Sequence, residues 1–318
     1  MNFTKDSINI DPAKEVEKIT SKLREDVAKK LKKRGAVVGI SGGIDSSVVL
    51  ALCAKTFGPD RVLGVMMPEN DSNPESLELA KKLSDMFNTK YVVENMTEAL
   101  AGFGCYRRRD EAIKNIFSEF NNNYKAKITL PTNLMEKESL NVFQLTIITP
   151  DGKIKSERLP LKEYLQIVAA SNFKQRSRMS MLYYHAEARN YAVIGTGNKN
   201  EHEQGFFVKY GDGGADIKPI AHLFKTQVFQ LADYLEVPEE IRKRTPTTDT
   251  YSAEQTQEEF FFRVPFGILD RIWYGWEQNV PVEDIAKALK LTEENVESII
   301  HDTQRKIRTT EYLRMEPL

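Results

Sequence analysis

The sequence predicts an α/β fold in which helices cover both faces of a doubly wound parallel sheet. Two observations carry this prediction. Short β-branched runs at 36–40, 61–67, 90–93 and 192–195 alternate with helical patterns, as in chains that build such a sheet. The first run also leads through adjacent glycines into an apolar helical stretch. In sheets of this kind, ligands bind at the carboxyl ends of the strands.

The first elements are a long helix and the strand that follows it. Asp11 and Pro12 form a helix-start signal, and apolar residues recur at helical spacing as far as Lys33. Strand 36–40 comes next, and a loop of small residues separates it from a helix over 45–57.

The next elements repeat the alternation of strand and helix. A strand over 61–67 leads through a polar loop, 68–74, to a helix that ends near Met86, and a third strand covers 90–93. Because parallel strands end at the same edge of a sheet, loop 68–74 is expected to flank the same ligand as the loop after strand 36–40.

Residues 124–165 break the alternation, and they predict a small β insertion in an otherwise single domain, 1–318. Residues 128–131 have β character. Two further β patterns, 142–149 and 154–159, flank the turn sequence Pro-Asp-Gly-Lys. The sequence therefore predicts a β-hairpin attached to the main domain.

The rest of the chain returns to the α/β pattern and ends in helices. A helix is predicted over 174–190, a strand over 192–195, a glycine-rich loop over 198–214 and a helix over 225–236. Three helical patterns close the chain. The last two imitate a helix-turn-helix, but acidic residues at the start of the final helix favour packing over DNA binding.

Composition limits the classes of function to consider. Lys+Arg 45 against Asp+Glu 46 gives a net charge of -1, which favours neither nucleic acid nor a membrane surface as a partner. Cys53 is expected in the core and Cys105 in a loop-like stretch, and they form no C-x-x-C motif. The basic run 107–109 is interpreted as a solvated face, with a phosphate contact as the alternative. Without a signal segment or an apolar run that could span a bilayer, a cytoplasmic enzyme is expected.

The loop after strand 36–40 is the most informative segment of the chain. It reads Ser-Gly-Gly-Ile-Asp-Ser over residues 41–46. The glycines let backbone N–H groups approach a phosphate, and the following helix adds the positive end of its dipole. Asp45 would repel a bare anion, but it suits a phosphate that carries Mg²⁺. The alternative is an ordinary capped turn between strand and helix.

Known phosphate-binding motifs narrow the interpretation of this loop. No lysine follows the glycines, which excludes a Walker loop, and the glycines are adjacent, which excludes the dinucleotide fingerprint. The remaining pattern, S-G-G-x-D-S, resembles the pyrophosphate loop of the ATP pyrophosphatases. These enzymes split ATP between its α- and β-phosphates.

A second group of polar residues follows strand 192–195, at another strand end. Thr196 is placed to bond a nucleotide, and Glu201 is placed to supply a second carboxylate to a metal near Asp45. Lys209 and Asp216 follow in a glycine-rich context that suits contacts with a polar substrate. An ordinary solvated loop is the alternative.

Together, these segments resemble the ammonia-dependent NAD synthetases. The resemblance runs from about residue 15 to the end of the chain, apart from 124–165, and rests on the order and spacing of short motifs. They are Ser-Gly-Gly-Ile-Asp-Ser at 41–46, Lys-Gln-Arg-Ser-Arg-Met at 174–179, Gly-Thr-Gly-Asn at 195–198 with Glu201, the stretch 205–216, Lys-Thr-Gln at 225–227 and Pro-Thr at 246–247. The fold that it implies is the adenine nucleotide α-hydrolase type.

The resemblance implies a role for each matching residue. The residues it assigns to ATP are Gly39, Ile40, Ser41, Gly42, Gly43, Ile44, Asp45, Ser46, Thr196, Lys225 and Thr247. Those it assigns to the deamido-NAD site are Arg176, Lys209, Asp216, Tyr312 and Leu313. Asp45 and Glu201 would hold Mg²⁺, and Asp45 and Lys225 would be catalytic.

The implied activity is the ATP-dependent amidation of deamido-NAD to NAD. The nicotinate carboxylate would attack the α-phosphorus of ATP, and ammonia would then displace AMP from the acyl-adenylate. The chain has no room for a glutaminase domain beside this fold, so free ammonia or a separate glutaminase would supply the nitrogen. The family also implies a homodimer with substrate sites near the subunit interface.

Two departures from the family pattern leave the acid substrate open. Tyr312 and Leu313 stand where the family has His and Lys, and residues 248–250 alter the motif that follows Pro-Thr. An amide ligase that adenylates another carboxylate is therefore the alternative. An RNA-modifying adenylase is disfavoured by the absent C-x-x-C motif and the neutral charge, and a non-catalytic nucleotide sensor is a further alternative.

Overall fold

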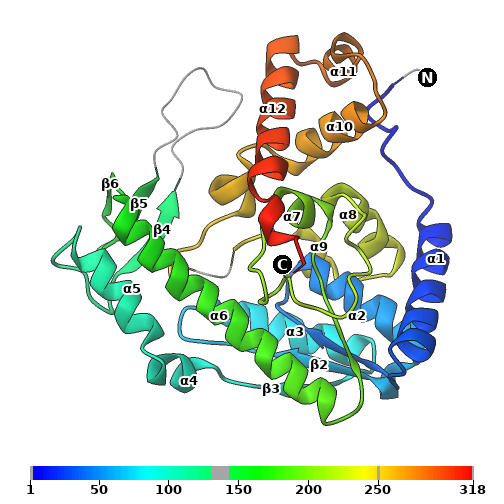
Figure 1. Cartoon of the computed structure of the whole chain (residues 1–318), viewed down its shortest axis with the longest axis horizontal. Coiled ribbons are helices and arrows are strands. Elements are labelled where there is room, and N and C mark those ends of the chain that lie inside the picture. Colours follow the sequence, from blue (N-terminus) through cyan, green and yellow to red (C-terminus); the bar gives the residue numbers. More distant parts are fainter. Residues whose placement is uncertain (1–2, 130–142, 249–250, 317–318) are drawn as a thin grey trace.

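A four-stranded parallel sheet with the order β3-β2-β1-β7 forms the centre of the computed structural model (Figure 1). The structure describes residues 3–129, 143–248 and 251–316. The sheet confirms the predicted fold class. Its strands are β1 (Ala36–Gly39), β2 (Val62–Met66), β3 (Lys90–Val93) and β7 (Ala192–Ile194).

The strand order creates a crevice between β1 and β7. From β1 the chain passes through α2 (Ile44–Phe57) to β2 on one side, whereas β7 pairs with β1 on the other side. The loops that leave β1 and β7 therefore diverge. Such a switch point in strand order is where open α/β sheets bind ligands.

Helices cover both faces of the sheet. One face packs against α2 and its neighbours α1 (Pro12–Glu25), α3 (Pro74–Met86) and α8 (Lys225–Tyr234). The other face packs against the long helix α6 (Leu161–Glu187), which crosses the front of the sheet in Figure 1. A π-helical turn, Asp26–Lys30, extends α1 to nearly its predicted end.

Neighbouring residues of β1 point to opposite faces of the sheet. Val38 packs in the cluster with α2, whereas Val37 packs with Leu182 of α6 and Val193 of β7. Both valines are fully buried. This explains why the strand is continuously apolar rather than alternating.

A separate antiparallel sheet confirms the predicted hairpin. Its strands are β4 (Lys125–Thr129), β5 (Gln144–Ile148) and β6 (Ile154–Arg158), in that order. Residues 130–142 of the predicted insertion lie outside the described residues, as do positions 249–250 of the altered motif. The α6 helix begins at Leu161, behind Pro160, and so starts inside the range predicted for the insertion and well before residue 174.

Two short helices, α4 (Thr97–Gly102) and α5 (Cys105–Lys114), lie in a segment for which no helix was predicted. The prediction of a loop at Cys105 is wrong. Gly104 takes a left-handed conformation (φ 69°), and the α5 helix starts directly after it, at Cys105. The Cys105 thiol donates to a backbone carbonyl of α6. Cys53 is fully buried, as expected.

The prediction of a solvated basic face is wrong for Arg109. This side chain is 8% exposed and forms an ion pair with Asp71, which also pairs with Lys174 of α6. Arg109 also pairs with the adjacent Asp110 (2.8 Å), but Asp71 lies 38 residues away, so the basic run itself carries no sign of it. The cluster ties loop 67–73 to α5 and α6.

Further helices complete the fold. The predicted loop 198–214 contains a short helix, α7 (Lys199–Gln204), and α9 (Glu239–Lys243) follows α8. The three predicted C-terminal helices are present as α10 (Phe266–Glu277), α11 (Val282–Leu289) and α12 (Glu293–Thr309). They share an apolar core of their own at one end of the molecule (Figure 1). In the part of the chain that the structure describes, no helix is both long and apolar enough to cross a membrane.

Candidate active site

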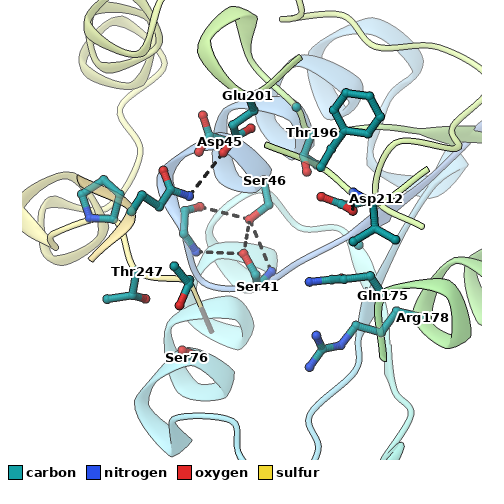
Figure 2. A pocket seen from close by; sticks show the side chains of 18 of the residues that line it. Ser41, Asp45, Ser46, Ser76, Gln175, Arg178, Thr196, Glu201, Asp212 and Thr247 are labelled. Carbon is teal, nitrogen blue, oxygen red and sulfur yellow. Dashed lines mark hydrogen bonds between the residues drawn. The ribbon is translucent and has the colours of Figure 1, made fainter. Parts of the chain in front are cut away.

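A pocket of ≈ 630 Å³ lies at the carboxyl ends of β1 and β7 (Figure 2). Its wall includes the loop after β1, the loop after β2, the α6 helix and the segment that follows α9. Segments far apart in the sequence therefore meet where the strand order predicts a ligand. The volume is in the range of sites that hold small molecules and cofactors.

The loop after β1 is held by hydrogen bonds among its own small residues. The Ser46 hydroxyl donates to the carbonyl of Gly43 (3.0 Å) and accepts from the backbone N–H of Ser41 (3.3 Å). The hydroxyls of Ser41 and Ser46 lie 3.2 Å apart. Figure 2 shows these bonds at the centre of the pocket. The loop is thus ordered by its own residues, and it leads directly into the N-terminus of α2.

Gly42 is the position in this loop where glycine is required. Its φ of +74° lies in the left-handed region, and a Cβ there would stand 2.5 Å from the carbonyl oxygen of Ser76. A side chain would therefore be strained and would also collide with the first turn of α3. The glycine lets the loop and α3 approach each other closely.

Asp45 and Lys225 form an ion pair at the mouth of the crevice. The Lys225 side chain is fully buried, and its ammonium donates to Oδ2 of Asp45. Asn198 donates to Oδ1 of the same carboxylate (2.9 Å). Burial alone lowers the pKa of Lys225, but the carboxylates of Asp45 and Glu201 outweigh it, so the pKa is raised and the lysine stays charged.

Glu201 brings a second carboxylate to this group. It caps α7 by accepting from the backbone N–H of Asn198 (3.1 Å), and the Gln257 amide donates to its other oxygen (3.2 Å). Burial, followed by the charge of Asp45, raises the pKa of Glu201 to about 8. Two carboxylates so close together favour a shared cation or a shared proton.

The residues present fit a magnesium ion that is also bound to phosphate. Hard cations take oxygen ligands, and Mg²⁺ is usually held by one or two carboxylates with substrate phosphates and water. Asp45 and Glu201 supply such a pair. Among the described residues no group of three or more potential metal ligands occurs, so the protein alone offers no complete metal cage.

Most residues predicted to bind ATP lie together in the pocket. Its lining includes Gly39, Ile40, Ser41, Gly43, Ile44, Asp45, Ser46, Thr196, Glu201, Lys225 and Thr247. Gly42 belongs to the same loop but does not line the pocket. The structure therefore brings together four segments, of which the positions of the strand ends linked two and the resemblance alone added Lys225 and Thr247.

The residues predicted for the deamido-NAD site lie outside this lining. Arg176 of α6 donates to the carbonyl of Lys209 (3.1 Å), and the Lys209 ammonium donates to the carbonyls of Tyr312 (3.3 Å) and Met315 (2.8 Å). Arg176, Lys209 and the C-terminal segment that holds Tyr312 and Leu313 thus form one group.

Asp216 is engaged within the fold. Its two carboxylate oxygens accept from the backbone N–H of Val193 (2.8 Å) and from the hydroxyl of Tyr183 (3.0 Å). These bonds fix the glycine-rich segment against β7 and α6.

Several pocket residues had no role in the sequence analysis. They are Ser76, Gln175, Arg178, Asp212 and Arg244. Figure 2 shows Ser76 on the same side of the Ser41 loop as Thr247, and Gln175 and Arg178 on the other side. Gln175 and Arg178 fall within a motif of the resemblance, but no local signal marks Arg244 or Ser76, since their place depends on how α3 and α9 pack.

The fold and the pocket define an α/β protein with a candidate nucleotide site at the crevice of a parallel sheet. The observations are the strand order, the Ser-Gly-Gly-Ile-Asp-Ser loop at the crevice and the acidic pair beside a buried lysine. More narrowly, the chain belongs to the NAD synthase family, whose model matches residues 15–130 and 121–317.

Curated relatives agree with this assignment. The NH(3)-dependent NAD(+) synthetase of Rhizobium rhizogenes is 45% identical over 316 residues, which cover 99% of this chain and 95% of that protein. The protein of the same name from Thermotoga maritima is 36% identical over 268 residues (82% and 89%). Because the first match spans 99% of the chain, it includes the region 124–165 that the motif resemblance left out.

Solved structures share the fold. The NMN synthetase from Francisella tularensis has a TM-score of 0.65 at 24% identity, and 98% of each chain is covered. The NH3-dependent NAD synthetase from Campylobacter jejuni has a TM-score of 0.62 at 23% identity, with 97% of this chain and 99% of that chain covered.

Proposed function

We propose that this protein amidates deamido-NAD to NAD with ATP and ammonia, and releases AMP and pyrophosphate. Family membership and the names of the curated relatives support this function. The observation that carries it is the meeting of Asp45, Glu201 and Lys225 with the Ser41–Ser46 loop in one pocket. This combination suits a nucleoside triphosphate with a bound cation.

The reaction consists of two displacements. An oxygen of the nicotinate carboxylate attacks the α-phosphorus, and the bond between that phosphorus and the bridging oxygen to the β-phosphorus breaks, so pyrophosphate leaves. Ammonia then attacks the acyl carbon, AMP leaves with the electron pair, and the amide nitrogen loses a proton. Adenylation is needed because a free carboxylate has no adequate leaving group.

The described residues act in this scheme mainly through position and charge. The loop after β1 presents backbone N–H groups and the hydroxyls of Ser41 and Ser46 to the phosphates. Lys225 offsets the charge that develops on the leaving pyrophosphate. Asp45 and Glu201 would hold Mg²⁺, which when bound would neutralise phosphate charge. No side chain need act as a nucleophile.

A homodimer is part of this proposal, and the surface of α6 supports it. Leu161, Leu165 and Tyr184 are large apolar side chains that are 71%, 56% and 63% exposed on this helix. Leu165, Arg176 and Tyr184 are all exposed positions of α6. The group of residues assigned to deamido-NAD therefore adjoins the surface that suits a second subunit.

We place the enzyme in the cytoplasm, with free ammonia or a separate glutaminase as the nitrogen donor. An amide ligase of the same type that acts on another carboxylate remains the alternative substrate assignment. The names of the curated relatives do not favour it.

The test is product formation from purified protein. With Mg-ATP and an ammonium salt, the protein should release AMP and pyrophosphate only when deamido-NAD is added, and NAD should form in equal amount. Nicotinic acid and nicotinic acid mononucleotide serve as comparison acids. Nucleotide binding without deamido-NAD-dependent release of pyrophosphate would exclude the proposed substrate.

A further inference from the structure

Three cationic side chains line the nucleotide pocket among the described residues, namely Arg178, Lys225 and Arg244. The charge of Lys225 is engaged by Asp45. Neither arginine forms an ion pair with a described carboxylate. A triphosphate would thus meet two arginines whose charges have no acidic partner within the described part of the chain.

Arg244 differs in this respect from the two basic residues before it. Arg242 pairs with Asp233, and Lys243 pairs with Glu239, both at the protein surface. Arg244 ends α9, takes an extended conformation (φ -70°, ψ 131°) and is half-buried at the pocket wall. Of the three consecutive basic residues 242–244, only Arg244 therefore has its side chain in the wall of the pocket.

The contact of Arg244 with α3 places it beside the phosphate loop. Its Nη2 donates to the hydroxyl of Ser76 (3.0 Å), and Ser76 is 8% exposed. The carbonyl oxygen of the same Ser76 is the atom nearest to a Cβ built on Gly42 (2.5 Å). Only one residue thus separates the guanidinium from the loop that cradles phosphates.

Arg178 occupies a different part of the wall. It comes from α6 and donates to the carbonyl of Met67 (3.2 Å), in the loop after β2. In Figure 2 it lies across the Ser41 loop from Ser76 and Thr247. The two arginines therefore approach a bound nucleotide from different sides, and Arg244 is the one linked through Ser76 to Gly42.

We propose that Arg244 binds the β- and γ-phosphates of ATP and the pyrophosphate that they become, an inference that rests on the proposed use of ATP. Its planar guanidinium can present several donors to phosphate oxygens at once. The hydroxyl of Ser76 holds it in place without neutralising its charge. Arg244 would therefore stabilise the leaving group together with Lys225.

Ligand titration tests this role without any need for turnover. Binding of pyrophosphate, ATP and AMP, each with Mg²⁺, is measured by calorimetry for the wild type and for Arg244→Gln. Loss of one charge-assisted contact should weaken pyrophosphate and ATP binding about tenfold to a hundredfold. The affinity for AMP should not change, because AMP lacks the two phosphates.

Lys243→Gln is the matched control. It removes the same charge one residue earlier, from a side chain that is 75% exposed and paired at the surface, and all three affinities should equal those of the wild type. Pyrophosphate binding of Arg244→Gln at wild-type strength would overturn the proposal, as would an equal loss for AMP. If Arg244→Gln does not fold, Arg244→Met takes its place, because methionine also removes the charge but keeps much of the length of the side chain, and wild-type pyrophosphate affinity in that variant would likewise overturn the proposal. A failure of the proposed function would show separately, as absence of NAD formation by the wild type.

Discussion

Asp45 joins a buried lysine to the amide of Asn198 and is the residue on which the site depends most directly. Its charge keeps Lys225 paired while the nucleotide is absent, and it would hold Mg²⁺ when the nucleotide binds. Asparagine keeps the shape of the side chain but removes the charge. It leaves the ammonium of Lys225 buried without its closest counter-ion.

Asp45→Asn should therefore lower the rate of AMP release at least about a hundredfold, in the range found when a single group that stabilises charge is removed. Asp60→Asn is the control, because the Asp60 side chain is 91% exposed and is not part of the pocket lining. Turnover is measured as AMP formed per enzyme under saturating substrates. Unchanged turnover in Asp45→Asn would refute the role of its charge.

Asp270 gives a prediction about pH. It is fully buried and accepts from the Asn200 amide (2.6 Å) and from the backbone N–H of Thr226 (2.7 Å). Burial outweighs these hydrogen bonds and raises the pKa of its carboxyl from 3.8 to about 6. The folded protein thus holds this proton more tightly than the unfolded chain. The stability linked to it is present below pH 3.8 and is lost as the pH rises through 6.

The Asp270→Asn variant isolates this effect, because asparagine does not titrate. Its free energy of unfolding is measured with urea from pH ~4 to ~7, beside that of the wild type. The variant is expected to lose a hydrogen bond at every pH, which shifts its curve by a constant. The difference, wild type minus variant, should shrink as the pH rises. Parallel curves would contradict the raised pKa.

The sequence predicts site residues that belong to a contiguous motif, but not those that meet only through packing. Ser41, Asp45 and Thr196 could be predicted because each directly follows a strand or lies within a contiguous motif. Arg244 and Ser76 could not, because they meet only through the packing of α9 against α3. Arg109 was misjudged for the same reason, since its partner Asp71 is 38 residues away.

At the scale of elements, the conformation of the loop after β1 depends on the left-handed backbone of Gly42. Gly58, at the end of α2, has nearly the same φ (+80°) but has no atom within 4 Å of an added Cβ. Gly58 also has ψ 150°, in a region that almost only glycine adopts, so alanine at either position should cost roughly 1–3 kcal/mol from the backbone conformation alone. Only alanine at position 42 should also displace the loop or the first turn of α3.

Gly42→Ala should therefore weaken Mg-ATP binding more than about tenfold, or 1.4 kcal/mol, whereas Gly58→Ala should bind normally. Both variants should melt at a lower temperature than the wild type, and the collision at position 42 should make the decrease larger in Gly42→Ala. Nucleotide affinity by calorimetry and melting by circular dichroism give the two readouts. Normal ATP affinity in Gly42→Ala would show that the loop tolerates a side chain.

Elements whose sequence carries a clear pattern of apolar and turn residues were predicted well, and elements without such a pattern were not. The β1 to β3 strands and the hairpin of β5 and β6 combine β-branched runs with turn residues, so their types were correct. The first half of α6 was missed because the β patterns before Pro160 suggested that the insertion continued. The α7 helix was missed because glycines follow so soon after it.

At the scale of the whole molecule, the exposed apolar side chains of α6 predict a dimer. The purified protein should sediment at about twice the chain mass of 36.4 kDa. Leu165→Glu places a charge on the proposed interface and should shift the equilibrium to the monomer. Ile154→Glu is the control, because Ile154 is 70% exposed but lies on β6.

Sedimentation equilibrium measures both variants over a range of concentrations. A wild-type protein that sediments as a monomer would refute the dimer. A monomeric Ile154→Glu variant would move the interface to the antiparallel sheet. Deamido-NAD affinity, measured in parallel, should fall in Leu165→Glu if the subunit interface contributes to the substrate site.

The C-terminal segment completes the helix that carries Glu201. Arg314 donates to the carbonyls of His202 (3.2 Å) and Glu203 (2.7 Å), in the last turn of α7, and so occupies acceptors that this short helix cannot satisfy itself. The two partners are more than a hundred positions apart. During synthesis, α7 leaves the ribosome long before Arg314 does. The side of the pocket that carries Glu201 should therefore mature last in folding, after the sheet and the loop after β1 have formed.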